Sequence, residues 1–151
     1  MIVRSKANEL LEQLFWKDSS GTKTYYYIGL SIKTPNPDGS NFKEPEIPDG
    51  ATDDDGNPIT TNEYQRVHLE NVIGRASNAI IKNEAIVFFN EAEHYAWGEI
   101  THFGIFTSKT GGTPIFYGEL SASKEIPKGY IPIFRIGKLQ VGLDQDPANP
   151  V

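Results

Sequence analysis

The sequence contains no cysteine, and its single methionine is residue 1. Disulfides, thiolate nucleophiles and cysteine-ligated metals are therefore excluded. No apolar run approaches the roughly 20 residues that a membrane-spanning helix needs, so we expect no membrane insertion. With 14 basic against 20 acidic residues, the chain also lacks the basic surplus of a nucleic-acid-binding surface. Its 151 residues are enough for one domain of ordinary size with a substantial core.

The acidity is concentrated in one segment. Residues 34–63 hold eight acidic residues and one basic residue, a net charge of −7, whereas the other 121 residues hold 12 acidic and 13 basic residues, a net charge of +1. The same segment contains five prolines and three Asp-Gly pairs, which remove backbone donors and favour tight turns. We therefore predict a long exposed loop, of the kind that is usually functional or mobile.

The N-terminal segment has the spacing of an amphipathic helix, which we predict over residues 5–16. The apolar residues that recur on one helical face are Ala7, Leu10, Leu11, Leu14 and Phe15. This stripe has to cover something apolar, which we expect to be a sheet face or a neighbouring subunit.

Strands are predicted over the rest of the chain, because β-branched and aromatic residues alternate between turn signals. They are expected at residues 24–32, 64–70, 84–89, 97–106, 115–120, 130–136 and 138–143. About seven strands of this kind predict an all-β fold, an antiparallel β-sandwich with one short N-terminal helix. We expect a single domain over residues 1–143 and a flexible tail over residues 144–151.

His102 is the residue that most resembles a general base. Strand alternation places it on the opposite face from Glu99 and Thr101, which opposes a catalytic grouping. We favour a partly buried histidine bonded to a backbone carbonyl, because no nucleophile or base stands at a recognised spacing.

Two acidic stretches could suggest a metal site. Residues 91–94 (EAEH) supply too few convergent ligands, and residues 53–57 (DDDGN) lack the glycine and glutamate that an EF-hand requires at its sixth and twelfth positions. We favour a solvated loop and a solvated turn, with adventitious calcium as the minor alternative for the second stretch. We expect no metal, no cofactor and no catalytic residue.

Aromatic residues offer a possible carbohydrate platform formed by Trp16, Trp97 and the Tyr25-Tyr26-Tyr27 run. Alternation sends Tyr26 to one face of a strand and its two neighbours to the other. We favour core or subunit interface over sugar binding for this group.

A series of short motifs recurs in a fixed order over most of residues 8–143. The most specific is WGEITHFGIF at residues 97–106, and weaker ones lie at residues 8–15, 27–31, 64–67, 84–88, 116–120 and 134–139. In this order and spacing the sequence resembles a family of small virion structural proteins of tailed bacteriophages, labelled tail-fibre, tail-associated or head-decoration proteins. In that family a short glycine-rich turn joins the Glu-Pro element to Tyr-x-Arg-Val, whereas here the acidic residues 46–63 intervene.

The resemblance implies a non-enzymatic structural component of the virion, made in the host bacterial cytoplasm. A tail or tail-fibre and baseplate-associated protein acting in assembly or attachment is favoured. A capsid decoration or head-fibre protein and a host-glycan receptor-binding module are the alternatives. The partners implied are other virion proteins, and a nearly neutral body with an apolar stripe suits a homo-oligomer, with a trimer favoured. Host surface glycan is a possible further partner.

The residues we expect to make these contacts fall into three groups, on the helix, on the first strand and on the acidic loop. They are Leu10, Leu11, Leu14, Phe15, Tyr26, Asp53, Asp54 and Asp55.

Overall fold

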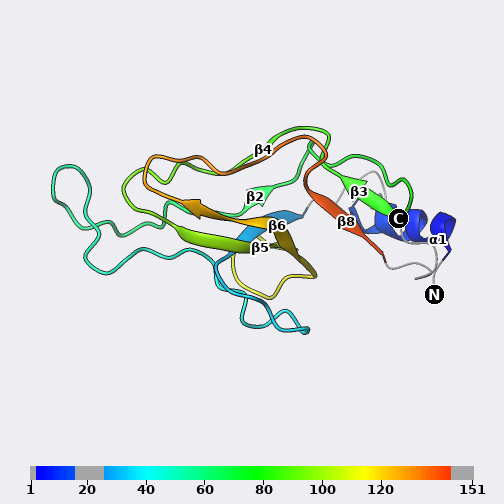
Figure 1. Cartoon of the computed structure of the whole chain (residues 1–151), viewed down its shortest axis with the longest axis horizontal. Coiled ribbons are helices and arrows are strands. Elements are labelled where there is room, and N and C mark those ends of the chain that lie inside the picture. The colour runs from blue at the N-terminus through cyan, green and yellow to red at the C-terminus, as the bar shows by residue number, and fades with distance from the viewer. Residues whose placement is uncertain (1–2, 16–25, 144–151) are drawn as a thin grey trace. The chain divides into compact units, whose positions relative to one another are not determined.

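The computed structural model describes residues 3–15 and 26–143. The prediction of an all-β, sandwich-like fold with antiparallel strands and one short helix is confirmed (Figure 1). The elements are α1 (Arg4–Phe15), β1 (Tyr27–Ser31), β2 (Val67–His68), β3 (Ile80–Lys82), β4 (Val87–Phe88), β5 (Gly98–Phe106), β6 (Phe116–Ile126), β7 (Ile133–Phe134) and β8 (Gln140–Gly142). The predicted tail, Trp16 and Tyr25 lie outside the described residues.

Eight strands stand in the described part of the chain, where about seven were expected. The sequence missed β3, a strand of three residues directly after Asn78 and Ala79, which both have positive φ. It also ended β6 at residue 120, whereas the strand continues to Ile126. The added residues, Ser121 to Glu125, are all exposed, so they carry no apolar alternation that a pattern could detect.

The chain forms two compact units. The first comprises Met1–Tyr26, Leu69–Val87 and Phe134–Val151, and the second comprises Tyr27–His68 and Phe88–Ile133. The single domain expected over residues 1–143 stays a prediction, since two compact units can also unfold as one cooperative body.

The first unit is built on α1, β3 and β8. Ala7, Leu11 and Phe15 lie one helical turn apart and are buried, and α1 contacts β3. A fully buried Asn83 then connects the strands. Its amide nitrogen lies 2.9 Å from the Ala85 carbonyl oxygen, and its side-chain oxygen accepts a hydrogen bond from the backbone N–H of Leu139 at 3.0 Å. Satisfying both ends of the amide is what makes its burial tolerable.

The second unit is built on a four-stranded antiparallel sheet in the order β2-β1-β5-β6. Gly29 of β1 and Gly104 of β5 are paired directly across the sheet. A Cβ atom on Gly29 would lie 2.8 Å from the Glu44 carboxylate, and one on Gly104 would lie 2.6 Å from the Phe42 ring. Both positions need glycine because the segment after β1 packs closely on this face.

Both edges of this sheet are protected. β2 pairs with only two residues of β1, and the next free N–H of β1, on Leu30, donates to the Tyr64 hydroxyl at 2.8 Å. On the other side, and among the described residues, β6 pairs with β5 alone. The register between them breaks so that residues 120–123 face Thr101, and a bulge of this kind discourages edge-to-edge pairing.

A buried ion pair joins distant parts of the second unit. Arg66, with 4% of its side chain exposed, binds both carboxylate oxygens of Glu44 at 2.8 and 3.0 Å. The Tyr64 hydroxyl donates to the same carboxylate at 2.6 Å, and the Arg66 guanidinium lies 3.4 Å from the centre of the Phe106 ring. Glu44, Tyr64, Arg66 and Phe106 are called the clasp below.

The clasp also holds the hairpin between β5 and β6. The guanidinium of Arg66 donates to the carbonyl oxygens of Ser108 and Gly111 at 3.0 and 2.8 Å. A bidentate carboxylate, two carbonyls and an aromatic face satisfy most of the guanidinium, which offsets the cost of burying its charge.

Replacing one partner of the clasp should destabilise the fold strongly. We expect Glu44→Gln to lower the free energy of unfolding by about 2–3 kcal/mol, somewhat less than for a fully buried pair because the Glu44 side chain is 26% exposed. Urea denaturation at neutral pH measures this. Glu46→Gln is the matched control, because its pair with Lys43 is exposed and should contribute about 0.5 kcal/mol or less. Equal losses for the two variants would contradict the clasp.

The clasp should also make stability sensitive to alkali. Burial, with the adjacent Glu44 carboxylate as a second cause, raises the pKa of Tyr64 above its ordinary value of 10.0. The folded state therefore keeps the proton that the unfolded state loses above about pH 10, and the free energy of unfolding falls as pH rises beyond that point, by up to about 1.4 kcal/mol per pH unit. We expect Tyr64→Phe, less stable at neutral pH, to show a shallower alkaline decline in urea midpoint. Tyr117→Phe, at an exposed position of β6, should leave the decline unchanged.

Candidate interaction surfaces

Most of the apolar stripe of α1 is buried within the first unit. Leu11 and Phe15 are buried there, whereas Leu10 and Leu14 are half-buried on the flank of α1. The helix is held by side-chain contacts to its own unit, since Asn8 accepts a hydrogen bond from the backbone N–H of Ala79 at 2.6 Å. Leu10 and Leu14 are thus the part of the predicted helix contact that remains accessible, and a role for them in association stays a prediction.

Tyr26 belongs to the same unit and is half-buried. Its ring packs edge-on against Phe15, with the ring centres 5.4 Å apart, and burial raises the pKa of its hydroxyl. The structure therefore brings two of the predicted contact residues together, but through internal packing.

The acidic run at residues 53–57 is a hairpin turn. The Asp53 N–H donates to the Asn57 carbonyl at 2.9 Å, the Gly56 N–H donates to the Asp53 carbonyl at 3.0 Å, and Gly56 takes a positive φ of 81°. The Asp53 carboxylate accepts hydrogen bonds from the backbone N–H groups of Asp55 and Asn57, and these bonds lower its pKa. The expected turn is therefore present, and Asp54 and Asp55 are exposed at its tip.

Residues 46–63, called the extension below, project from the second unit as a closed appendage (Figure 1). Its two ends meet, because Asn62 donates to the carbonyl of Pro45 at 2.8 Å. The prediction of an exposed loop over 34–63 is wrong at its middle. Pro45 is fully buried beside Glu44 of the clasp, so the segment before the extension is packed on the sheet.

The C-terminal end of the extension, at Asn62 and Glu63, is held by hydrogen bonds to the segment before β5. The Glu63 carboxylate accepts the backbone N–H of His94 at 3.0 Å and lies 3.2 Å from its ring Nδ1. The Tyr95 hydroxyl donates to the side chain of Asn62 at 2.7 Å, and burial raises the pKa of Tyr95. His94, which was considered as part of a metal site, thus binds Glu63 and helps to hold the end of the extension. No cluster of metal-ligating side chains is found among the described residues.

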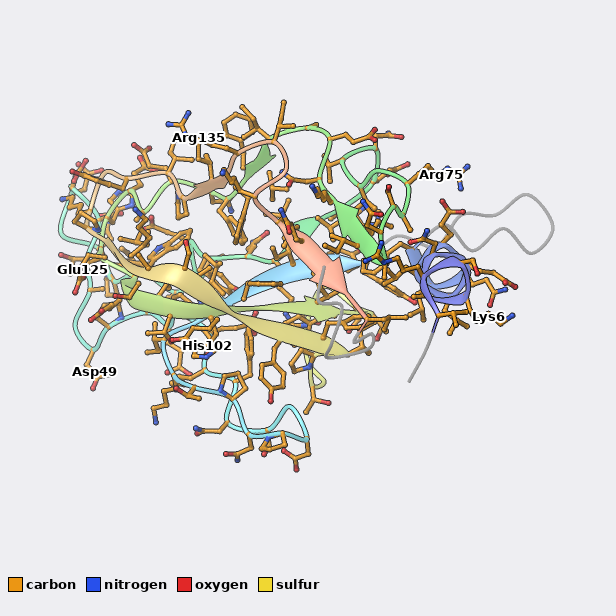
Figure 2. The ribbon with its side chains drawn as sticks, turned by 45° about the vertical axis from the view of Figure 1, so that its right-hand side comes forward. Lys6, Asp49, Arg75, His102, Glu125 and Arg135 are labelled. Atoms are coloured by element: carbon orange, nitrogen blue, oxygen red, sulfur yellow. The ribbon has the colours of Figure 1, made fainter. Side chains whose placement is uncertain are left out.

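His102 is buried on β5, on the side along which the segment after β1 runs (Figure 2). Its Nδ1 lies 2.8 Å from the Thr101 hydroxyl. The partner of this ring nitrogen is thus a hydroxyl and not the expected backbone carbonyl. Burial alternates along β5, with Ile100, His102 and Gly104 buried and Thr101 half-buried, in line with the expected alternation. The extra residues of the register break lie on β6, and β5 itself stays in continuous register with β1.

The second unit exposes one cluster of large apolar side chains that sequence reasoning missed. Phe88 and Tyr130 are each 60% exposed, Ile131 is 52% exposed and Ile133 is 39% exposed. They lie on the paired segments that carry β4 and β7, and are called the apolar ribbon patch below. Both strands were expected, at residues 84–89 and 130–136, and Phe88 stands exposed between the buried Val87 and Phe89. The sequence pattern did not predict that β4 pairs with β7, which brings these side chains together.

Among the residues that the structure describes, no helix has the length and apolar character needed to cross a membrane.

The extension should be removable without unfolding the second unit. We expect replacement of residues 46–61 by a Gly-Ser linker of about four residues to change the free energy of unfolding by less than about 1 kcal/mol, because Pro45 and Asn62 already touch and the turn at Asp53 is bonded internally. Circular dichroism and urea denaturation check this. A loss of several kcal/mol, as expected for Glu44→Gln, would mean that the extension supports the core.

Comparison with known proteins identifies the family of the chain. No curated protein matches the sequence. The family described as Podophage GP4 fiber I protein gp80 matches residues 2–142, which is nearly the whole chain. The resemblance to small virion proteins of tailed bacteriophages is thereby confirmed. Because the match covers far more than half of the sequence, the chain belongs to this podophage fibre-protein family.

Proposed function

We propose that this protein is a non-enzymatic structural component of a tailed-phage virion. In this role it is associated with the tail fibre or baseplate and acts in assembly or attachment. The observation that carries the proposal is the family match over residues 2–142, to a family described as a fibre protein. A structural role also suits the features of this small β-rich protein, which has an acidic extension anchored at its base and an exposed apolar patch.

The hydrogen bonding of the titratable residues supports a structural role. Glu44 and Arg66 neutralise each other inside the clasp, Glu63 holds His94 and its neighbours, and His102 is bonded to a threonine hydroxyl. Each of these groups is used to fix a loop or strand in place. Side chains occupied in this way suit a rigid building block that contacts other virion proteins and copies of itself.

Labelling of intact particles tests the proposal. We expect mass spectrometry of density-purified particles of a phage that carries this gene to detect the protein, and gold-labelled antibodies against the extension to mark the tail or its fibres. Gold on the capsid would favour the head-fibre or decoration alternative. Absence of the protein from purified particles would overturn the structural role itself.

A glycan-binding module is the second candidate, favoured by the 60% exposure of Tyr130, an aromatic surface on which a sugar ring can stack. Binding of the purified protein to host cell-wall polysaccharide, weakened about tenfold by Tyr130→Ala, would support it. Tyr26→Ala serves as the control, because that ring is already packed on Phe15.

A further inference from the structure

Three Asp-Gly pairs stand in the second unit, at residues 38–39, 49–50 and 55–56. An aspartate followed by glycine can react with its own backbone, because glycine has no Cβ to shield the amide nitrogen that follows the aspartate. The reaction requires that the glycine N–H is free of an acceptor and that the peptide between the two residues can rotate. The three pairs differ in both respects.

In two of the pairs the glycine amide closes a turn. The Gly39 N–H donates to the Asn36 carbonyl at 2.8 Å, and the Gly56 N–H donates to the Asp53 carbonyl at 3.0 Å. Each glycine is therefore the fourth residue of its turn, and rotation of the peptide before it would break the hydrogen bond that closes the turn. Both of these Asp-Gly amides are thereby held in place.

Asp49 and Gly50 occupy the middle of their turn instead. The hydrogen bond joins the Ala51 N–H to the Pro48 carbonyl at 3.1 Å, and Gly50, the third residue, has a φ of 76°. These are the features of a type II turn, whose central amide takes no part in the closing bond. Within the described part of the chain, the Gly50 N–H donates no hydrogen bond.

The central peptide of this turn can rotate while the ends of the turn stay bonded. Rotation changes the φ of Gly50, and glycine adopts either sign of φ at little cost. The site is open, because a Cβ on Gly50 would meet nothing within 4 Å beyond its chain neighbours, whereas one on Gly39 would lie 3.2 Å from the Pro114 carbonyl oxygen. Asp49 is exposed, and Figure 2 shows its side chain pointing away from the ribbon.

The Asp38 carboxyl group is restrained in a second way. It accepts hydrogen bonds from the hydroxyl and the backbone N–H of Ser40 at 2.6 and 3.0 Å, and these bonds lower its pKa. An ionised carboxylate is a poor electrophile, because the protonated carboxyl group is the form that can lose water. The Asp49 side chain accepts no hydrogen bond among the described residues, so it lacks this restraint.

We propose that Asp49 is a site of spontaneous isomerisation to isoaspartate. The nitrogen of Gly50 bonds to the side-chain carbon Cγ of Asp49, and the amide proton leaves with the carboxyl hydroxyl as water, which gives a five-membered succinimide. Water then adds to one of the two ring carbonyls and opens the ring. Opening at Cγ restores aspartate, whereas opening at the main-chain carbonyl leaves the backbone running through Cγ to Gly50.

The product keeps its charge and changes the shape of the extension. A carboxylate remains at residue 49, but the backbone gains one methylene carbon, so the turn from Pro48 to Ala51 is lengthened. The base of the extension is unaffected, because Asn62 still donates to the carbonyl of Pro45. The reaction therefore remodels the extension and leaves the clasp intact, and it does not depend on the proposed function.

A matched pair of variants tests the effect of the turns. Asp49→Asn and Asp55→Asn place the same Asn-Gly sequence at a free amide and at a bonded amide, and ammonia then leaves in place of water. We expect the first variant to deamidate at least about fivefold faster in the folded full chain, because ring closure at residue 55 first breaks a hydrogen bond. Mass spectrometry of the peptides over time at neutral pH measures both rates. Equal rates in the folded chain would overturn the proposal.

Concentrated urea separates the effect of the turn from that of the neighbouring residues. The two variants should deamidate at similar rates once the turns are lost, so that the difference is found only in the folded chain. A difference of the same size in urea would mean that the local sequence sets the rate, and it would overturn the inference.

The wild-type chain gives the direct measurement. After prolonged incubation at neutral pH, enzymatic methylation of isoaspartyl groups followed by peptide mapping should locate the modification at residue 49. Gly50→Ala should reduce it several-fold, because the added Cβ shields the nitrogen. Isoaspartate found mainly at residue 38 or 55 would overturn the proposal, as would its absence from residue 49 of the folded chain over a time in which the urea-unfolded chain forms it.

Discussion

The ion pair between Arg66 and Glu44 is the interaction on which the second unit depends. It joins the segment after β1, the approach to β2 and the hairpin after β5, which are distant in the sequence. A charge with so little exposure is stable only when its partners are complete. The two carboxylate oxygens, two carbonyls and the Phe106 ring supply them, so the geometry of three loops is set together.

This constraint explains how an acidic insertion can be tolerated in a small β protein. The extension starts beside Glu44 and ends at Tyr64, so the clasp closes its base, and its own turn at Asp53 completes it. The charge of the protein is thereby displayed on an appendage whose ends are fixed. Repulsion among its carboxylates acts in solvent, where it is screened, and does not disturb the core.

The second unit has sheet edges that resist pairing with further strands, and it also has an exposed apolar surface. The sheet edges are closed by Tyr64 on one side and by a bulged, charged strand on the other, which discourages uncontrolled strand addition. The apolar ribbon patch has no such protection. A building block of a phage fibre needs this division, because association has to occur at chosen surfaces and nowhere else.

The sequence by itself determined the β-rich class, the position of the helix, the turns at the Asp-Gly pairs and the family, because these depend on local spacing and on motif order. It did not determine that Leu11 and Phe15 would be internal or that Phe88 would be left exposed. Those outcomes depend on strand pairing, register breaks and contacts between residues tens of positions apart. Only the tertiary structure decides them, since a local pattern states that a side chain is apolar and not which neighbour covers it.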